Sequence, residues 1–468
     1  MTQIIDRTSD DRSANQSATD LTDLVRRVAG PVLDGADPRA AEEVAAFNLA
    51  VTHRPRVVVG ATSSEDVVAA VSWAVAHGLP VAVQSTGHGA VHGVADALMI
   101  TTGRVRSVEI DPVRRTATVG AGTRWVDVVE AAAPYDLAPV SGSSSDVGVV
   151  GFCTGGGIGP LSRAHGFGAD QVSSFELVTA DGRLRHVDAG SEADLFWAVR
   201  GGKGNFGVVT SMVLGLVPLT TMYAGAVFFA ASSVRDVLHS WRTWAPTLPE
   251  RATTSVALLN LPPFEDIPEP LRGQHVAMLR FAYDGGESEG AALLAPMLAA
   301  GEVLLSGVQA MRYTEADSIH QDPADPLPVW EQGTLLRELS AEAVEVLIEQ
   351  AGPASDKALA MVELRLMGGA LGRQPRVPNA VAGREGAFSL LALGVLLPGL
   401  EEVVKAAGIG LIAALAPWTT GTSIVNWLSS TASREDVARA WRPEVYERLV
   451  AIKQQVDPDR VFRFGHAL

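Results

Sequence analysis

Two loops built from small residues carry the side chains that could do chemistry. The first, STGHGAVHG (85–93), places two histidines among glycine, serine and threonine after a predicted strand. Small residues let backbone N–H groups approach a pyrophosphate, and a histidine in such a loop can reach a cofactor ring. The alternative is a tight turn that carries an ordinary histidine, and this motif alone favours that alternative.

The second loop, SGSSSDVGVVGFCTGGGIG (141–159), is long and equally poor in large side chains. Its serines and glycines are hard to explain as core packing. A large planar ligand whose phosphates and ring edges contact the backbone would explain them. A flexible surface loop is the alternative, but VGVVG is too apolar for one.

A third glycine-rich segment, GGKGNFG (201–207), fits the spacing G-x-G-x-x-G. In a dinucleotide-binding motif a strand comes before these glycines and a helix after them. Here the pattern predicts a helix before and a strand after, so we reject that interpretation. A plain helix-to-strand turn is one reading, and close backbone approach of Gly207 and Val209 to a ligand is the other.

Charged residues interrupt one apolar strand pattern, ALAMVELRLMGG (358–369). Because side chains alternate along a strand, Glu363, Arg365 and Met367 share one face. A buried charge needs a partner or a function. A catalytic pair and an ordinary charged pair on a solvated face both remain open.

The elements that would position these residues fall into two groups. From 56 to 216, short apolar strands alternate with amphipathic helices such as 63–78, 123–136 and 191–201, and 175–188 is predicted to form a hairpin. After about 217, strand patterns recur at irregular spacing with helices between them, at 222–231, 253–261, 275–285, 358–369 and 388–397. The second group predicts an α+β unit with one large sheet. The stretch 434–462 is strongly helical and is expected to stop at Asp457-Pro458.

Composition excludes several classes of protein. The 468 residues carry a formal net charge of −16, which disfavours nucleic acid and anionic membrane as partners. Cys153 is the single cysteine, so no intramolecular disulfide is expected. We find no zinc-binding, Walker A or serine-hydrolase motif and expect no metal site. The polar, acidic start and the lack of a spanning segment predict a cytoplasmic protein.

Five segments in a fixed order resemble a known family. They are 54–93, 146–172, 178–182, 194–216 and 442–463. Together they resemble the berberine-bridge-enzyme-like branch of the vanillyl-alcohol oxidase (p-cresol methylhydroxylase, PCMH) flavoproteins. The resemblance implies a two-domain α+β, PCMH-type FAD-binding fold with a large antiparallel sheet in the substrate domain. We expect an N-terminal tail and short helix (1–40), an FAD domain (41–217), a substrate domain (218–420) and a C-terminal segment that returns to the FAD domain (421–468).

The resemblance also implies which residues bind FAD. His88 matches the position that bonds to the flavin 8α-methyl group. The thioether cysteine of doubly tethered members matches Ser144, so a single tether is expected and Cys153 is expected to be a small buried residue. Gln84 stands where arginine is common, and Thr86 replaces a glycine, so the loop must avoid positive φ there. The other expected FAD contacts are Ser85, Gly87, Gly89, Ala90, Ser143, Gly148, Gly151, Gly207, Val209 and Asn426.

Catalytic roles follow from the same resemblance. The sheet strand with Glu363 and Arg365 is expected to face the flavin. Burial would raise the pKa of Glu363 until it can accept a substrate proton, and Arg365 could hold an anionic substrate. Asn426 near the flavin and, more weakly, Tyr313 complete the candidates.

We expect an oxidase that passes hydride from a C–H bond next to O or N of a hydrophobic small molecule, such as a specialised metabolite, to FAD and then to O2, giving H2O2. A dehydrogenase, a multi-step oxygenating or rearranging enzyme, and a non-catalytic flavin carrier are the alternatives. The chain is expected to act as a monomer or homodimer.

Overall fold

The first unit of the computed structural model is built around a small, mostly parallel sheet. The structure describes residues 20–356 and 358–468, so residues 1–19 of the predicted tail and short helix (1–40) lie outside the described residues. The strand order is β1 (Val32–Asp34), β2 (Val57–Gly60), β4 (Leu98–Thr101) and β3 (Val81–Gln84). Helix α3 (Ser64–Ala76) begins where the Ser63 hydroxyl accepts the Asp66 N–H, and its Val67, Val71 and Trp73 pack on β2 and β4.

A five-stranded antiparallel sheet forms the rest of this unit. Its order is β5 (Val108–Asp111), β6 (Thr116–Gly120), β10 (Val208–Gly215), β8 (Val172–Val178) and β9 (Leu184–Asp188). The predicted hairpin is confirmed by the antiparallel pairing of β8 with β9. Helices α4 (Trp125–Ala132) and α7 (Ala193–Gly202) pack on it.

The long loop expected at 141–159 contains a helix that the sequence did not predict. Helix α5 (Val149–Thr154) begins after Gly148 and buries Val149 and Cys153 against the core of the five-stranded sheet. Tertiary packing therefore overrides the weak helix propensity of these small and β-branched residues.

The second unit contains one large antiparallel sheet, as predicted. The order is β15 (Val303–Ser306), β12 (Thr221–Ala230), β14 (His275–Tyr283), β13 (Ala252–Asn260), β18 (Met361–Leu366), β19 (Phe388–Val395) and β17 (Val329–Leu336), and β16 (Gln309–Arg312) also pairs with β12. Edge strand β17 was not among the predicted strands.

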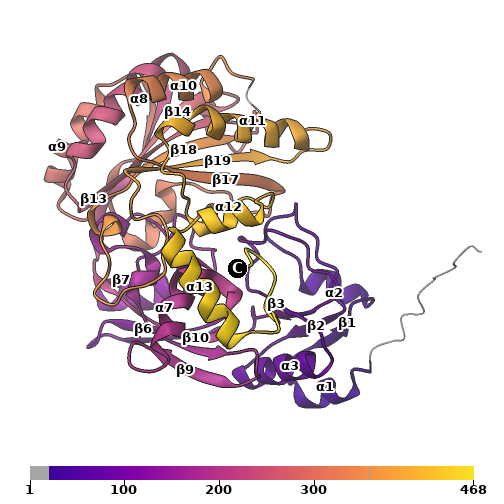
Figure 1. Cartoon of the computed structure of the whole chain (residues 1–468). Helices are drawn as coiled ribbons and strands as arrows, with labels where there is room; N and C mark the ends of the chain where they lie inside the picture. Colours follow the sequence, from indigo (N-terminus) through magenta and orange to yellow (C-terminus); the bar gives the residue numbers. More distant parts are fainter. Residues whose placement is uncertain (1–19, 357) are drawn as a thin grey trace, which may run out of the picture.

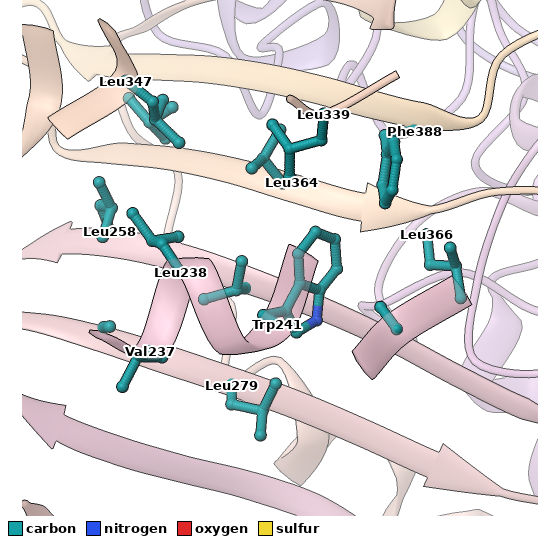
Figure 2. Close-up of a cluster of buried hydrophobic side chains, with 14 of the residues drawn as sticks. Val237, Leu238, Trp241, Leu258, Leu279, Leu339, Leu347, Leu364, Leu366 and Phe388 are labelled. Atoms are coloured by element: carbon teal, nitrogen blue, oxygen red, sulfur yellow. The ribbon is translucent and has the colours of Figure 1, made fainter. Parts of the chain in front are cut away.

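Four helices cover one face of the large sheet (Figure 1). They are α8 (Val234–Trp244), α9 (Glu287–Leu298), α10 (Ala341–Ala351) and α11 (Glu401–Ala414). Figure 2 shows Trp241 of α8 lying among side chains of the strands, including Leu279, Leu364 and Phe388. Because side chains alternate along a strand, burying this apolar face under the helices also determines which side chains lie on the opposite face of the sheet.

The opposite face of the large sheet looks toward the first unit (Figure 1). Residues directly opposite each other on neighbouring strands point to the same face. Gly333 pairs with Leu391, which pairs with Glu363, and Glu331 lies two residues before Gly333 on the same strand. Glu331 and Glu363 therefore share the face away from the helices.

The chain ends between the two units. Helices α12 (Arg434–Arg439) and α13 (Pro443–Val456) bring it back, and the C-terminus lies at the centre of the molecule in Figure 1. The predicted helix stop is confirmed, because α13 ends just before Asp457. No helix in the described parts of the chain is long and apolar enough to cross a lipid bilayer.

A buried ion pair joins the second unit to the first. Asp170 and Arg384 are each 7 % exposed, and Arg384 Nη2 donates to Asp170 Oδ1 at 2.6 Å. Asn379 Nδ2 donates to the same oxygen at 2.7 Å. These contacts hold the loop before β19 against the turn before β8.

Removing the carboxylate of this pair should destabilise the fold. Asp170→Ala leaves the Arg384 guanidinium buried without its counter-ion, a change that costs about 3–5 kcal/mol in comparable pairs. Glu250→Ala is the matched control, because the Glu250–Arg373 pair is at least half exposed and such pairs contribute about 0.2–1 kcal/mol. Thermal unfolding of both variants checks this. Equal melting temperatures would show that the Asp170 contact does not hold the units together.

Candidate functional site

A pocket lies where both units and the C-terminal segment meet. Segments far apart in the sequence line it: Asn48, His88, Gly89, Ala90, Val91, Lys203, Val329, Glu331, Asn426, Leu428, Ser430 and His466. Three of the predicted FAD-loop residues (His88, Gly89, Ala90) and the predicted Asn426 are among them. The structure therefore brings the histidine loop, the large sheet and the C-terminal segment to one place.

The loop after β3 presents His88 to this pocket as a neutral imidazole. Gly87 has φ +77°, and a Cβ there would lie 2.5 Å from Ala46 Cα, so glycine is needed. The His88 ring stacks on Phe47, with centroids 3.7 Å apart. Burial lowers the pKa of His88 to about 4, so a ring nitrogen lone pair is free at neutral pH. Thr86 avoids positive φ, as predicted.

The two small-residue loops converge beside His88. A Cβ on Gly148 would lie 3.2 Å from Ser85 Oγ, and this buried hydroxyl has no hydrogen-bond partner. Ser143 and Ser144 are half-buried, and Gly151 faces open space. An unpaired hydroxyl between two glycine-rich segments suits a ligand rich in acceptor oxygens, such as a pyrophosphate. These residues fit FAD.

Asn426 ties the C-terminal segment to the second small-residue loop. Its Nδ2 donates to the Phe152 carbonyl at 3.1 Å, and a Cβ on Gly155 would lie 1.9 Å from its Oδ1. Its backbone forms a short 3-10 turn, Val425–Trp427. Asn426 is thus fixed in the pocket wall by this contact.

Lys203 and Glu331 also line the pocket, and sequence reasoning missed both. Burial lowers the pKa of Lys203 to about 8 against the opposing effect of Glu331. Burial raises the pKa of Glu331 to about 7 against the opposing effect of Lys203. The charged residue inside GGKGNFG was the one available signal for Lys203. Glu331 was missed because β17 was not predicted.

Several predicted FAD contacts point elsewhere. Gln84 donates through Nε2 to the carbonyls of Val44 and Ala45, and its Oε1 meets His53. Its side chain is therefore committed to the protein rather than to a pyrophosphate.

The expected close approach at Gly207 is to a strand and not to a ligand. Its φ is +151°, and a Cβ would lie 2.5 Å from the Val178 carbonyl oxygen on β8. Val209 is buried in the core of the five-stranded sheet. The glycine serves helix-to-strand packing, as in the plain-turn reading of this segment.

Glu363 is buried in a cluster of positive charge. Arg280 Nη1 donates to its Oε1 at 2.5 Å, Arg365 Nε donates to its Oε2 at 2.8 Å, and Ser255 Oγ donates to Oε1 at 2.7 Å. The solvated-face alternative is wrong, because Glu363 is 0 % exposed.

The predicted rise in the pKa of Glu363 is also wrong. Burial alone would raise it, but the guanidinium groups of Arg365 and Arg280 outweigh burial and hold the pKa well below its usual range. The carboxylate is a permanent anion at neutral pH. Arg365 in turn lies over the Trp427 ring, 5.4 Å from its centroid.

Tyr313 lies apart from the residues that line the pocket. It is 4 % exposed, and its hydroxyl bonds to Ser141 Oγ at 2.7 Å. Burial raises its pKa to about 12, so it is a protonated phenol. Its contact ties the second unit to the start of the second small-residue loop.

Comparison with known proteins agrees with this geometry. The FAD binding domain family matches residues 55–188, and the family described as "Berberine and berberine like" matches 425–468. The FAD-linked oxidoreductase YgaK of Bacillus subtilis is 26% identical over 94% of this chain and 97% of its own. The (R)-6-hydroxynicotine oxidase of Paenarthrobacter nicotinovorans is 28% identical over 88% of this chain and 91% of its own.

Solved structures share the fold. The 6-hydroxy-D-nicotine oxidase of Arthrobacter nicotinovorans superposes with a TM-score of 0.78 at 24% identity, covering 94% of this chain and 97% of its own. The berberine-bridge-enzyme-like protein 1 of Physcomitrella patens gives 0.83 at 18% identity, covering 96% and 98%. The two family matches cover the His88 loop and the C-terminal segment of the pocket, so the chain carries an FAD binding domain and a berberine-like C-terminal segment, and it is similar to FAD-linked oxidoreductases over most of its length.

Proposed function

We propose that the chain is an oxidase that holds FAD by one covalent bond to His88 and oxidises a hydrophobic small molecule at a C–H bond next to O or N. The observation that carries this proposal is the neutral His88 imidazole, presented to a pocket that is also lined by Asn426 and by Glu331 of the edge strand β17. When bound, FAD supplies a two-electron acceptor that takes a hydride and passes electrons to O2.

The residues around the pocket suit such a role. Val91, Val329 and Leu428 supply an apolar wall that excludes water and favours a hydrophobic substrate. Asn426 offers an amide from a position fixed by its bond to Phe152. Glu363 holds the guanidinium of Arg365 in place, so that Arg365 keeps an orientation beside Trp427.

Oxygenation is a second candidate. The FAD-dependent monooxygenase prx3 of Penicillium roqueforti is 33% identical over 41% of this chain and 38% of its own. An oxidase releases one H2O2 for each O2 consumed, whereas an oxygenase retains oxygen in its product. Measuring O2 uptake and H2O2 together, first with (R)-6-hydroxynicotine and then with a panel of hydrophobic alcohols and amines, separates the two.

The tether is tested by removing its histidine. The parent protein should be yellow and keep its flavin after acid precipitation, whereas His88→Ala should release FAD on denaturation because no nitrogen remains to bond the 8α-carbon. Absorbance of the supernatant and intact mass of the protein measure this. Free FAD from the acid-precipitated parent would show that the flavin is not covalently held.

Cys153 should be irrelevant to attachment. Its thiol is fully buried, and burial raises its pKa far above neutrality, so no thiolate is available to bond a flavin. Cys153→Ser should therefore retain the flavin absorbance and the covalent mass of the parent. A flavin crosslinked to the peptide that contains Cys153 would overturn the single tether.

Glu363→Gln should act on stability rather than through an ionisation near neutral pH. It leaves Arg280 and Arg365 without their carboxylate, and losing one partner of a buried pair costs about 3–5 kcal/mol. Because the pKa of Glu363 is lowered, its stabilisation is complete above the unfolded value of about 4.3 and is lost only as pH falls below it.

The melting-temperature difference between the parent and Glu363→Gln should therefore be constant from about pH 6 to pH 8. A difference that changes steeply across that range would restore Glu363 as a group that titrates at working pH. Thermal unfolding in matched buffers measures it without any substrate.

A further inference from the structure

Glu331 and Lys203 are the two charged side chains of the pocket that the proposed function leaves without a role. Lys203 comes from the turn after α7 and Glu331 from the edge strand β17, so they approach the pocket from different units. Lys203 Nζ lies 3.6 Å from where a Cβ on Gly89 would be, and its Cε lies 2.7 Å from where one on Gly155 would be. The ammonium therefore sits beside the His88 loop.

Neither side chain forms a hydrogen bond or an ion pair within residues 20–356 and 358–468. The Lys203 ammonium and the Glu331 carboxylate attract each other electrostatically without direct contact, in a site shielded from water. Unpaired charges that line a pocket are expected to meet a ligand or a reacting group.

Glu331 is the only carboxylate among the residues that line this pocket. If His88 bonds to the flavin, the 8α-methyl group must lie in the same pocket, because the bond joins the imidazole to that carbon. A methyl C–H bond then breaks within a pocket whose other titratable groups are His88, Lys203 and His466. His88 is the nucleophile, Lys203 is a cation at neutral pH, and His466 Nε2 donates to the Leu428 carbonyl.

We infer that Glu331 accepts the proton that the 8α-methyl group of FAD loses when His88 bonds to it, while Lys203 stabilises the carboxylate before that step. The inference rests on the proposed covalent attachment and adds the group that makes attachment possible. With a pKa of about 7, Glu331 is able both to take up and to release a proton at neutral pH.

The step balances with O2 as the oxidant. A C–H bond of the methyl group breaks, its proton goes to Glu331, and the electron pair stays in the flavin ring system. A nitrogen of His88 forms a bond to the 8α-carbon and gives up its own proton. The flavin ring system then holds two extra electrons, and O2 takes these two electrons together with the proton held by Glu331 and the proton released by His88, which gives H2O2.

The test follows attachment over time and needs no substrate. The full chain is produced under riboflavin limitation, FAD is added in air, and the fraction of flavin that stays with acid-precipitated protein is measured. Glu331→Gln should still bind FAD but should attach it about 10²–10⁴-fold more slowly, the usual effect of losing a positioned base. Glu331→Asp, which keeps a carboxylate, should recover part of the rate.

Asp322→Asn is the matched control. Asp322 is exposed and lies outside the pocket lining, yet its charge reaches His88. If Glu331 acts by accepting a proton, and not through the electric field of its charge at His88, the Asp322→Asn variant should attach FAD at the parental rate. If Glu331→Gln is unstable, the attachment rate of Glu331→Ala is measured with and without added formate. Formate supplies an external carboxylate and should restore attachment if Glu331 is the proton acceptor.

Three results would contradict the inference, and each has a different cause. Attachment by Glu331→Gln at the parental rate would exclude Glu331 as the acceptor and leave the tether intact. Loss of attachment in Lys203→Met but not in Glu331→Gln would assign the proton to Lys203. A parent protein that never holds FAD covalently would overturn the tether and this inference together.

Discussion

A buried ammonium fixes the last part of the chain to the turn that carries Lys203. Lys453 Nζ donates to Asp457 Oδ2 at 2.5 Å and to the carbonyls of Asn205 and Phe462 at 2.6 and 2.7 Å. All three of its donors are used, and Asp457 also accepts the N–H groups of Val461 and Phe462. A charge this deeply buried is tolerated only with such complete pairing, so the end of α13 and the tail after it have a single position available to them.

The pocket depends on this arrangement. Asn205, which accepts the Leu468 N–H and donates to the His466 carbonyl, follows Lys203 by two residues. The same contacts therefore place Lys203 on one side of the pocket and His466 on another. The remaining walls come from the His88 loop and from β17, so no continuous stretch of sequence contains the site. Its shape is a product of how the two units and the C-terminal segment pack, which is where small-molecule sites are usually found.

Sequence reasoning succeeds where the determinants are local and fails where they are not. The apolar runs of β12, β13, β14, β18 and β19 predict a large sheet, and the local pattern of residues 175–188 predicts the hairpin that β8 and β9 form. Strand β17 has Glu331, Gln332, Gly333 and Thr334 in its centre, so its pattern does not resemble a buried strand, although the sheet pairs it fully with β19. Helix α5 is similar, because its small residues become helical only when Val149 and Cys153 pack on the core.

Glu331 and Glu363, on the face of the large sheet away from the helices, show why burial alone cannot identify a catalytic acid or base. The strand register places both side chains on the same face of the sheet, where they are shielded from water. Burial by itself raises the pKa of each. Glu363 meets Arg280, which lies 83 residues away in the sequence, as well as Arg365, and two cations outweigh desolvation. Glu331 faces one cation without contact, and desolvation prevails. On this face, Glu331 of the edge strand beside His88 is therefore the carboxylate that can exchange a proton near neutral pH. Glu363, at the centre of the sheet, stays ionised and holds Arg280 and Arg365 in place.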